Sequence, residues 1–317
     1  MKKNIRIVFM GTPEFAVETL QMITAHKYDI AAVVTVPDKP AGRGLKVRES
    51  AVKSFAVKQG IPVLQPANLK DPEFLHQLSR FGANLFIVVA FRKLPEEVWA
   101  MPALGTFNLH ASLLPQYRGA APINHAVMNG EDITGVTTFF LNSGIDTGKI
   151  ILNRALPIEP DETAGELHDR LMKTGAELVI ETIESIASGH CQPQDQPVVD
   201  SKIKSAPRLF REHTRITWNR PRLDVHNQIR GLSPYPGAWA ILKTEKAENE
   251  IKILRSSLSE KQDIAEPGHV IISDHTKISV ACLDGYIDLK IVQPAGKKSM
   301  NSTEFINGLK STELRFL

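Results

Sequence analysis

Short apolar runs alternate with amphipathic stretches along the N-terminal half of the chain. Runs rich in β-branched residues at 5–10, 30–36 and 84–90 predict buried strands. The stretches between them space their apolar residues as helices do, and one begins with Asp71 as N-cap and Pro72 at the first helical position. Strands that alternate with helices of this length predict right-handed βαβ units and a mostly parallel sheet.

The pattern continues beyond residue 100. Runs at 106–110, 134–141 and 149–158 predict further strands, and residues 163–188 predict one long helix with Gly175 as a candidate break. We therefore expect a doubly wound, Rossmann-like α/β domain over residues 1–188.

A different pattern follows this domain. Residues 189–207 are polar, carry three prolines and predict a linker. A helix is expected around 222–231, and closely spaced β-rich runs after it predict a small OB-like β-barrel. The second domain is therefore expected over residues 208–317. In "LSPYPGAW" (232–239) we expect Tyr235 and Trp239 to pack where the helix joins the barrel.

Composition places the chain among ordinary globular proteins. Of its 317 residues, 42% are hydrophobic and 23% are charged. Cys191 and Cys282 form no C-x-x-C pair, so we expect no disulfide framework and a reducing cytoplasmic location. The apolar run at the N-terminus is too short for a signal peptide, and no stretch approaches the roughly 20 apolar residues of a membrane span.

Charge is distributed unevenly. Residues 1–200 carry 19 Lys and Arg against 22 Asp and Glu, a net charge of −3, whereas residues 201–317 carry 19 against 13, a net charge of +6. A basic module after a mildly acidic one is compatible with a solvated surface or with a nucleic-acid partner.

Several common cofactor motifs are missing from the sequence. "GTPEFA" follows the first strand but lacks the glycine spacing of dinucleotide sites, and "GIDTGK" has no Ser or Thr after its lysine. The histidines and carboxylates do not take zinc-site spacings, so no metal is expected.

Asn108 and His110 stand two residues apart at the end of the strand 106–110. They therefore project from the same face, at the edge where ligands bind to an open parallel sheet. An amide can donate hydrogen bonds to a developing oxyanion, and an imidazole can carry a proton near neutral pH. The alternative is a helix-capping asparagine beside a half-buried histidine satisfied by the backbone.

Asp146 follows the next strong strand and stands between two glycine turns. It is either a turn aspartate bonded to its own backbone or the carboxylate that orients His110. Asn108, His110 and Asp146 together could handle an acyl or formyl group. No Ser or Cys elbow accompanies them, so direct attack by a substrate amine is favoured over a covalent enzyme intermediate.

The segments "FNLHASLLPQYRGAAP" (107–122) and "GIDTG" (144–148) resemble the folate-dependent formyltransferases. That resemblance implies a doubly wound domain that binds 10-formyltetrahydrofolate, with Asn108, His110 and Asp146 as the catalytic trio. It also implies that the turn "SLLP" contacts the folate. The residues of this turn are Ser112, Leu113, Leu114 and Pro115.

Four further segments resemble the branch of the family that formylates methionyl initiator tRNA: "GTPEFAV", "PDKPAGRGLK" (37–46), "LSPYPGAW" and "QPAGKKSM" (293–300). The resemblance implies transfer of the formyl group to the methionine α-amine. It also implies tRNA contacts by the loop with Arg43 and Lys46 and by Lys297 and Lys298, although both cation pairs could belong to solvated turns. We expect a monomer, and neither DNA nor a membrane as partner.

The sequence departs from the family at "FRKLP" (91–95), where relatives usually show Tyr-Gly-Leu-Ile-Leu-Pro. This loop, with Phe91 and Arg92, is expected to touch the pterin edge, so the departure affects how the folate is held there. Two other functions stay open. One is a sugar-amine formyltransferase, and the other is a non-catalytic RNA-binding protein on the same fold.

Overall fold

The computed structural model describes residues 4–41, 46–197, 203–261, 263–309 and 314–317. The chain forms two compact units that are not continuous in sequence. The first comprises Met1–Gly119, Thr134–Leu156 and His168–Ser205, and the second Ala120–Ile133, Pro157–Leu167 and Ala206–Leu317. Two segments from the first 188 residues therefore belong to the second unit, and the domain boundaries expected from the sequence stay a prediction.

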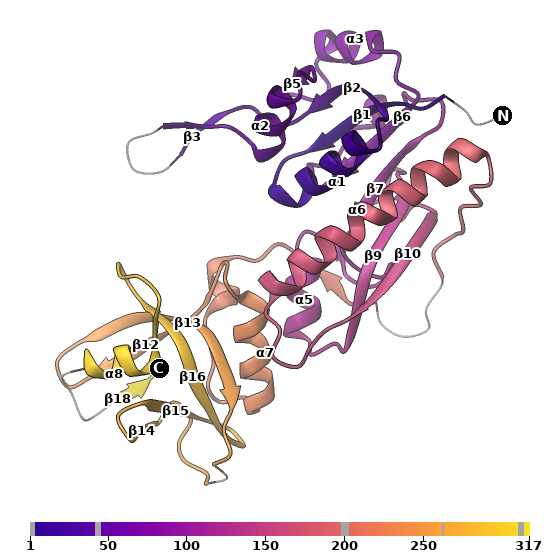
Figure 1. Cartoon of the computed structure of the whole chain (residues 1–317). Coiled ribbons are helices and arrows are strands. Elements are labelled where there is room, and N and C mark those ends of the chain that lie inside the picture. The colour runs from indigo at the N-terminus through magenta and orange to yellow at the C-terminus, as the bar shows by residue number, and fades with distance from the viewer. Residues whose placement is uncertain (1–3, 42–45, 198–202, 262, 310–313) are drawn as a thin grey trace. The chain divides into compact units, whose positions relative to one another are not determined.

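Within the described residues, the first unit is built on a seven-stranded sheet of order β10-β9-β7-β6-β1-β2-β5 (Figure 1). β1 runs parallel to β2 and β6, as β2 does to β5 and β6 to β7, whereas β9 is antiparallel to β7. This confirms the predicted doubly wound, mostly parallel sheet. The strands are β1 (Arg6–Gly11), β2 (Asp29–Val34), β5 (Val63–Leu64), β6 (Leu85–Val89), β7 (Thr106–His110), β9 (Ile133–Phe140) and β10 (Ile150–Pro157).

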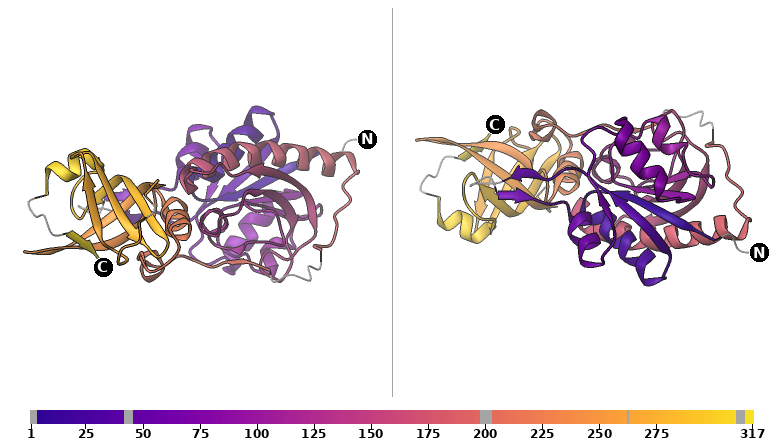
Figure 2. Two further views of the ribbon diagram at one scale, coloured as in Figure 1. Left: turned by 90° about the horizontal axis from the view of Figure 1, so that it is seen from below. Right: turned by 90° about the horizontal axis from the view of Figure 1, so that it is seen from above.

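Helices cover both faces of this sheet (Figure 2). On one face, Phe74 of α3 packs in an apolar cluster with Val8 and Val88. On the other, Gly175 of α6 lies against Leu109. The helices and small strands are α1 (Glu14–Ala25), α2 (Ala51–Lys58), α3 (Pro72–Arg80), α4 (Glu96–Trp99), α6 (Ala164–Ser188), the hairpin β3 (Lys39–Ala41) and β4 (Lys46–Arg48), and the paired β8 (Arg118–Gly119) and β11 (Ser205–Ala206).

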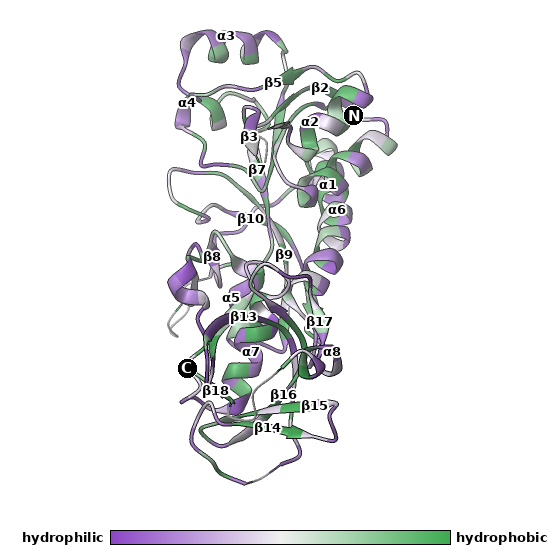
Figure 3. Cartoon of the chain, turned by 90° about the vertical axis from the view of Figure 1, so that its left-hand side faces the viewer, coloured by the Kyte–Doolittle hydropathy of each residue, from purple (hydrophilic) through white to green (hydrophobic). Residues whose placement is uncertain are grey.

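Helix α6 is continuous through Gly175, so the candidate break there was wrong. A Cβ at Gly175 would come within 2.8 Å of Leu109 Cδ2, so this glycine allows close packing on the sheet. Hydrophobic and hydrophilic residues alternate along the helix (Figure 3), and its exposed positions recur every three or four residues, as in an amphipathic helix. Those exposed residues include Asp169, Lys173, Glu177, Glu181 and Glu184.

Among the described residues, the second unit has an antiparallel sheet of order β14-β15-β16-β13-β12-β18, with β17 paired to β16. A bridge between His269 and Arg315 brings its two ends together, so the sheet is a nearly closed barrel, as predicted. Its elements are α5 (Pro122–Met128), the 3₁₀ helix η1 (Arg211–Thr214), α7 (Arg222–Leu232), β12 (Ala238–Thr244), β13 (Glu248–Leu258), β14 (Val270–Ser273), β15 (Lys277–Cys282), β16 (Gly285–Pro294), β17 (Met300–Asn301), α8 (Ser302–Asn307) and β18 (Leu314–Phe316).

The barrel has its own apolar core. Val225 and Ile229 of α7 reach into it, and the rings of Trp218 and Phe316 lie 5.2 Å apart there. Tyr235 does not join this core, because 83% of its surface is exposed, so the packing expected for it was wrong.

Helix α7 is unusual because buried residues occupy all its sides from Val225 to Leu232. Its buried polar groups are consequently bonded. Arg230 donates to Asn227 Oδ1 at 2.7 Å and to the Glu162 carbonyl at 3.2 Å. His226 contacts Ser256 Oγ at 3.0 Å and Asp161 Oδ1 at 3.2 Å. These contacts tie residues 159–162 to the helix.

His226 gives the stability of this unit a pH dependence. Burial lowers the pKa of His226. The negative charge of Asp161 raises this pKa, whereas the positive charge of Arg230 lowers it further. The unfolded chain therefore takes up a proton below about pH 6.5 more readily than the folded one, and stability is lost as pH falls.

His226→Gln should consequently reduce the drop in urea midpoint between pH 7.5 and pH 5.5, followed by tryptophan fluorescence. His275→Gln, in an exposed turn, serves as the control and should keep the native drop. An unchanged drop in His226→Gln would show that other groups set the acid sensitivity.

Candidate active site

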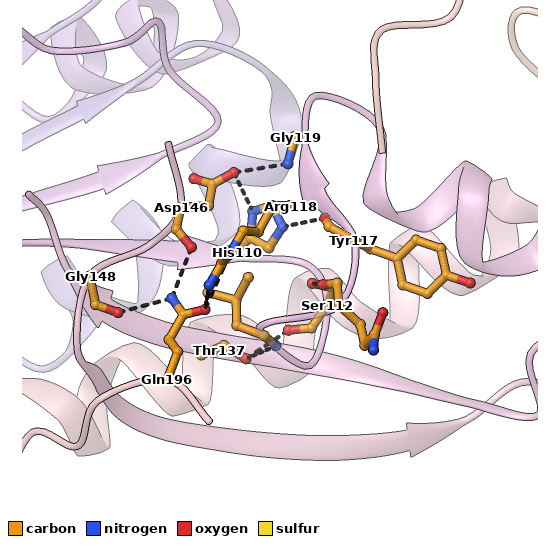
Figure 4. Close-up of polar contacts among 11 residues, drawn as sticks. His110, Ser112, Tyr117, Arg118, Gly119, Thr137, Asp146, Gly148 and Gln196 are labelled. Atoms are coloured by element: carbon orange, nitrogen blue, oxygen red, sulfur yellow. Dashed lines mark hydrogen bonds and ion pairs between the residues drawn. The ribbon is translucent and has the colours of Figure 1, made fainter. Parts of the chain in front are cut away.

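His110 ends β7 and is buried, with 6% of its surface exposed. Its Nε2 lies 2.9 Å from the Tyr117 carbonyl oxygen, and its Nδ1 lies 3.9 Å from Asp146 Oδ2 (Figure 4). The first contact is a hydrogen bond that the ring donates, because a carbonyl oxygen only accepts. The second is too long for a direct hydrogen bond. His110 is thus anchored through Nε2 and turns Nδ1 toward a carboxylate.

Asp146 sits in the turn that follows β9 and has a φ of 53°, in the left-handed region. Its Oδ2 accepts a hydrogen bond of 3.0 Å from the Gly119 N–H. The turn closes tightly, since a Cβ at Gly148 would lie 1.6 Å from the Phe140 carbonyl oxygen. Aspartate tolerates this backbone conformation better than most residues, and glycine is required two positions later.

Two other non-glycine residues near these strand ends share the left-handed conformation. Ala90, directly after β6, has a φ of 47°, and Tyr117, whose carbonyl holds His110, has a φ of 59°. Residues in such conformations concentrate at functional sites, where the surrounding structure must hold them in place. The segments that follow β6, β7 and β9 therefore combine left-handed backbone conformations with candidate chemistry.

Asn108 is half-buried and precedes His110 by one pleat on β7, so both side chains project from the same face. It pairs in register with Val88 on one side and Phe139 on the other. Its amide therefore lies on the same face of β7 as His110, and the structure brings His110 and Asp146 together.

The turn Ser112–Pro115 is held from within. Thr137 Oγ1 donates to the Ser112 carbonyl at 2.7 Å and accepts from the Leu114 N–H at 3.3 Å. Ser112, Leu114 and Pro115 are buried, and Leu113 is half-buried. A ligand at this turn would therefore meet mainly its backbone and the side chain of Leu113.

The loop after β6 is tied to a neighbouring loop. The guanidinium of Arg92 donates to the carbonyls of Pro66 and Ala67 and lies 5.6 Å from the Phe91 ring centroid. Burial lowers the pKa of Arg92. A hollow of about 480 Å³ between residues 67–70 and 92–95 includes Arg92 but neither His110 nor Asp146. Phe91 is half-buried beside it.

The structure describes only some of the cations expected to contact nucleic acid. Arg43 lies outside the described residues, and only the backbone of Lys46, the first residue of β4, is described. Lys297 and Lys298 are exposed in the turn between β16 and β17.

The second unit carries an arginine–aromatic cluster that sequence reasoning missed. The guanidinium carbons of Arg211 and Arg215 lie 4.7 and 5.6 Å from the Trp239 ring centroid, and that of Arg208 lies 5.5 Å from Phe210. All three arginines are exposed, as is 49% of Phe210. Their density in the sequence after residue 207 was the only signal available. Cations over aromatic faces are common in surfaces that bind single-stranded nucleic acid.

Gln196 was missed as well. It falls in the polar segment 189–207, yet its side chain bonds to the backbone carbonyls of Asp146 and Gly148 and to the guanidinium of Arg118 (Figure 4). Within the described residues, no three His, Cys, Asp or Glu side chains gather in a way that could hold a metal ion. None of the described helices is both long and apolar enough to cross a membrane.

Comparison with known proteins adds to this geometry. The sequence model of the family described as "Formyl transferase" matches residues 3–183, and that described as "Formyl transferase, C-terminal domain" matches residues 208–310. The chain is 50% identical to the methionyl-tRNA formyltransferase of Flavobacterium johnsoniae over 307 residues, covering 97% of each chain. It is 47% identical to that of Bacteroides fragilis over 315 residues, covering 98% of this chain and 97% of the relative.

Two solved structures share the fold. WlaRD, a sugar 3N-formyl transferase solved with dTDP and 5-N-formyl-THF, has a TM-score of 0.63 and 21% identity, covering 93% of this chain and 99% of that one. HypX from Aquifex aeolicus in complex with tetrahydrofolic acid has a TM-score of 0.65 and 18% identity. The match covers 98% of this chain and 49% of HypX.

Proposed function

The chain belongs to the formyl transferase family, among its methionyl-tRNA formyltransferases, and we propose that Asn108, His110 and Asp146 carry its reaction. The formyl group of 10-formyltetrahydrofolate moves to the α-amine of methionine on initiator tRNA. The contact between His110 and Asp146 at a strand end of the sheet is the observation that supports this assignment of roles.

The protein has to supply only a few chemical groups for this reaction. The attacking amine must be neutral, and free α-amines have a pKa of about 7.7–8.0, so a small shift suffices. Its attack on the formyl carbon forms a carbon–nitrogen bond and a tetrahedral oxyanion. Asn108 N–H groups would stabilise the oxyanion, as hydrogen-bond donors do in acyl transfer. Collapse then breaks the bond to the folate nitrogen, which takes up the proton that the amine has lost.

Proton transfer is assigned to Nδ1 of His110. Nε2 is engaged with the Tyr117 carbonyl, so Nδ1 is the nitrogen that can exchange a proton. Asp146 Oδ2 faces Nδ1 at 3.9 Å, so the carboxylate lies beside the nitrogen that would carry the proton. The folate would lie along the turn Ser112–Pro115 and the loop of Phe91 and Arg92.

We further propose that different parts of the chain carry catalysis and tRNA binding. Residues 1–188 would carry catalysis and residues 208–317 would bind tRNA, joined by the segment 189–207, with Arg43, Lys46, Lys297 and Lys298 among the tRNA contacts. The exposed arginine–aromatic cluster of the second unit supports this, because its cations can neutralise phosphates independently of sequence. The reaction would take place in the cytoplasm, on a monomer.

The sugar-amine alternative is less well supported. Sugar formyltransferases share the fold at about one-fifth identity, whereas the tRNA enzymes match nearly the whole chain at about half. The catalytic trio weighs against a pure RNA binder, which has no use for it. A formyl-transfer assay that compares charged initiator tRNA, charged elongator tRNA and amino-sugar nucleotides tests the function directly, and preferred formylation of a sugar nucleotide would overturn it.

Loss of the oxyanion donor should lower turnover strongly. Asn108→Ala should reduce kcat about 10²–10³-fold, the usual effect of removing one such donor, while calorimetry shows folate binding retained. Asp146→Ala should be at least as damaging, because His110 loses its facing charge. Asn249→Ala, at an exposed position of β13, is the matched control. Near-native kcat in either active-site variant would refute the assigned roles.

Arg43 should matter for the acceptor and not for the donor. Arg43→Ala should impair formylation of methionyl-tRNA and leave folate affinity intact, because a cation between two glycines suits a phosphate backbone. Lys58→Ala, at the exposed end of α2, controls for a general loss of positive charge. If Arg43→Ala lost folate affinity instead, its loop would belong to the donor site.

Salt dependence should report the tRNA-binding cations. Each phosphate contact contributes a slope of roughly −0.7 to −0.9 to log K against log salt, so Lys297→Gln/Lys298→Gln and Arg211→Gln/Arg215→Gln should each flatten the slope for tRNA. Lys173→Gln on α6 is the control. Point variants are preferable to a cut at residue 208, because that cut removes α7, to which α5 is bonded through Asn124. Native slopes in both double variants would exclude these cations from the interface.

A further inference from the structure

We propose that Gln196 is a positioning residue that holds the turn of Asp146 in its catalytic geometry. This inference rests on the proposed function, since it assumes that Asp146 acts on His110. Gln196 lies fifty residues beyond Asp146, in a segment whose composition indicated only a connection between domains. Its side chain, however, reaches back to the active-site turn (Figure 4).

The amide of Gln196 uses both its donor and its acceptor groups. Its Nε2 donates to the Asp146 carbonyl at 2.8 Å and to the Gly148 carbonyl at 2.9 Å. Its Oε1 accepts from Arg118, at 3.2 Å from Nε and 2.6 Å from Nη2. Only an amide presents two donors and an acceptor in this arrangement, because a carboxylate has no N–H and an ammonium has no acceptor.

These contacts close a ring around His110. Arg118 lies between Tyr117, whose carbonyl accepts from His110 Nε2, and Gly119, whose N–H donates to Asp146 Oδ2. Gln196 therefore joins the segment that fixes one ring nitrogen to the turn that presents the carboxylate to the other. The distance between Nδ1 and Asp146 depends on both segments keeping their places.

The turn needs such support because Asp146 is in the left-handed conformation. The two carbonyls bonded by Gln196 belong to Asp146 itself and to Gly148, two residues further along the same turn. Without these bonds the turn can relax toward ordinary backbone angles and carry the carboxylate away from Nδ1. The segment itself does not depend on Gln196 alone, because Gln194 pairs through its backbone with Ile150.

A double-mutant cycle separates positioning from general structural support. In the native chain, Gln196→Leu should lower kcat for methionyl-tRNA formylation about 10- to 100-fold, since small displacements of a catalytic group cost that much. In an Asp146→Ala background, the same change should alter kcat less than about twofold, because the group through which it acts is gone. The KM for tRNA and the folate affinity by calorimetry should stay native.

A second variant identifies which bonds matter. Gln196→Glu keeps an oxygen for Arg118 but loses both donors to the turn, so it should lose as much kcat as Gln196→Leu. Gln194→Leu, whose side chain is exposed in the same segment, should keep native kcat. Circular dichroism and folate binding establish that each variant is folded, and Gln196→Glu replaces Gln196→Leu in the cycle if the latter is not.

Three results would overturn the proposal. These are native kcat in both Gln196 variants, an equal loss in the native and Asp146→Ala backgrounds, and a loss confined to KM. Failure of the proposed function is a separate outcome, since it would appear as an absence of methionyl-tRNA formylation by the unmodified chain.

Discussion

The left-handed turn at Asp146 is the constraint on which the candidate active site depends. A non-glycine residue in this conformation costs about 1 kcal/mol or more, and the cost persists only where neighbouring groups hold the backbone. Here the Gly119 N–H binds the carboxylate and Gln196 binds the carbonyls of residues 146 and 148. The carboxylate is thereby aimed at His110, whose ring is fixed from its other side by the Tyr117 carbonyl. The geometry of this candidate site is thus set mainly by backbone groups.

This dependence on backbone groups explains what could be predicted from the sequence. The parallel sheet followed from β-branched runs alternating with amphipathic helices. His110 and Asp146 do meet, but not because their strands end at one edge: β9 is antiparallel to β7, so Phe140 at its end pairs with Phe107, and the loop after β9 brings Asp146 back to His110. The Tyr117 carbonyl could not be foreseen, because any residue carries a carbonyl. Gln196 was hidden for a related reason, since a long-range bond leaves no local periodicity and its polar surroundings are typical of a linker.

The second unit shows the same limit in its packing. Closely spaced β-rich runs predicted a small barrel, and the sheet is nearly closed. The pattern could not reveal that residues 120–133 and 157–167 belong to this unit, because hydrophobic spacing identifies a buried face but not its partner. Helix α7 has polar residues on buried sides, and their partners, such as the Glu162 carbonyl, come from one of those distant segments. Tyr235 was misplaced because flanking prolines fix the backbone without directing the side chain inward.

The formyl transfer and the tRNA binding proposed for this chain depend differently on salt concentration. The nucleophile comes from the substrate, so the protein needs only a donor, a proton carrier and a carboxylate, and His110 and Asp146 are largely shielded from water. Salt screens such buried pairs weakly. The cations of the second unit are exposed, and their attraction for phosphates falls steeply with salt. Changes in surface charge can therefore alter which tRNA is bound without altering the electrostatic environment of the reacting groups. Selection of the tRNA is thereby separated from stabilisation of the oxyanion.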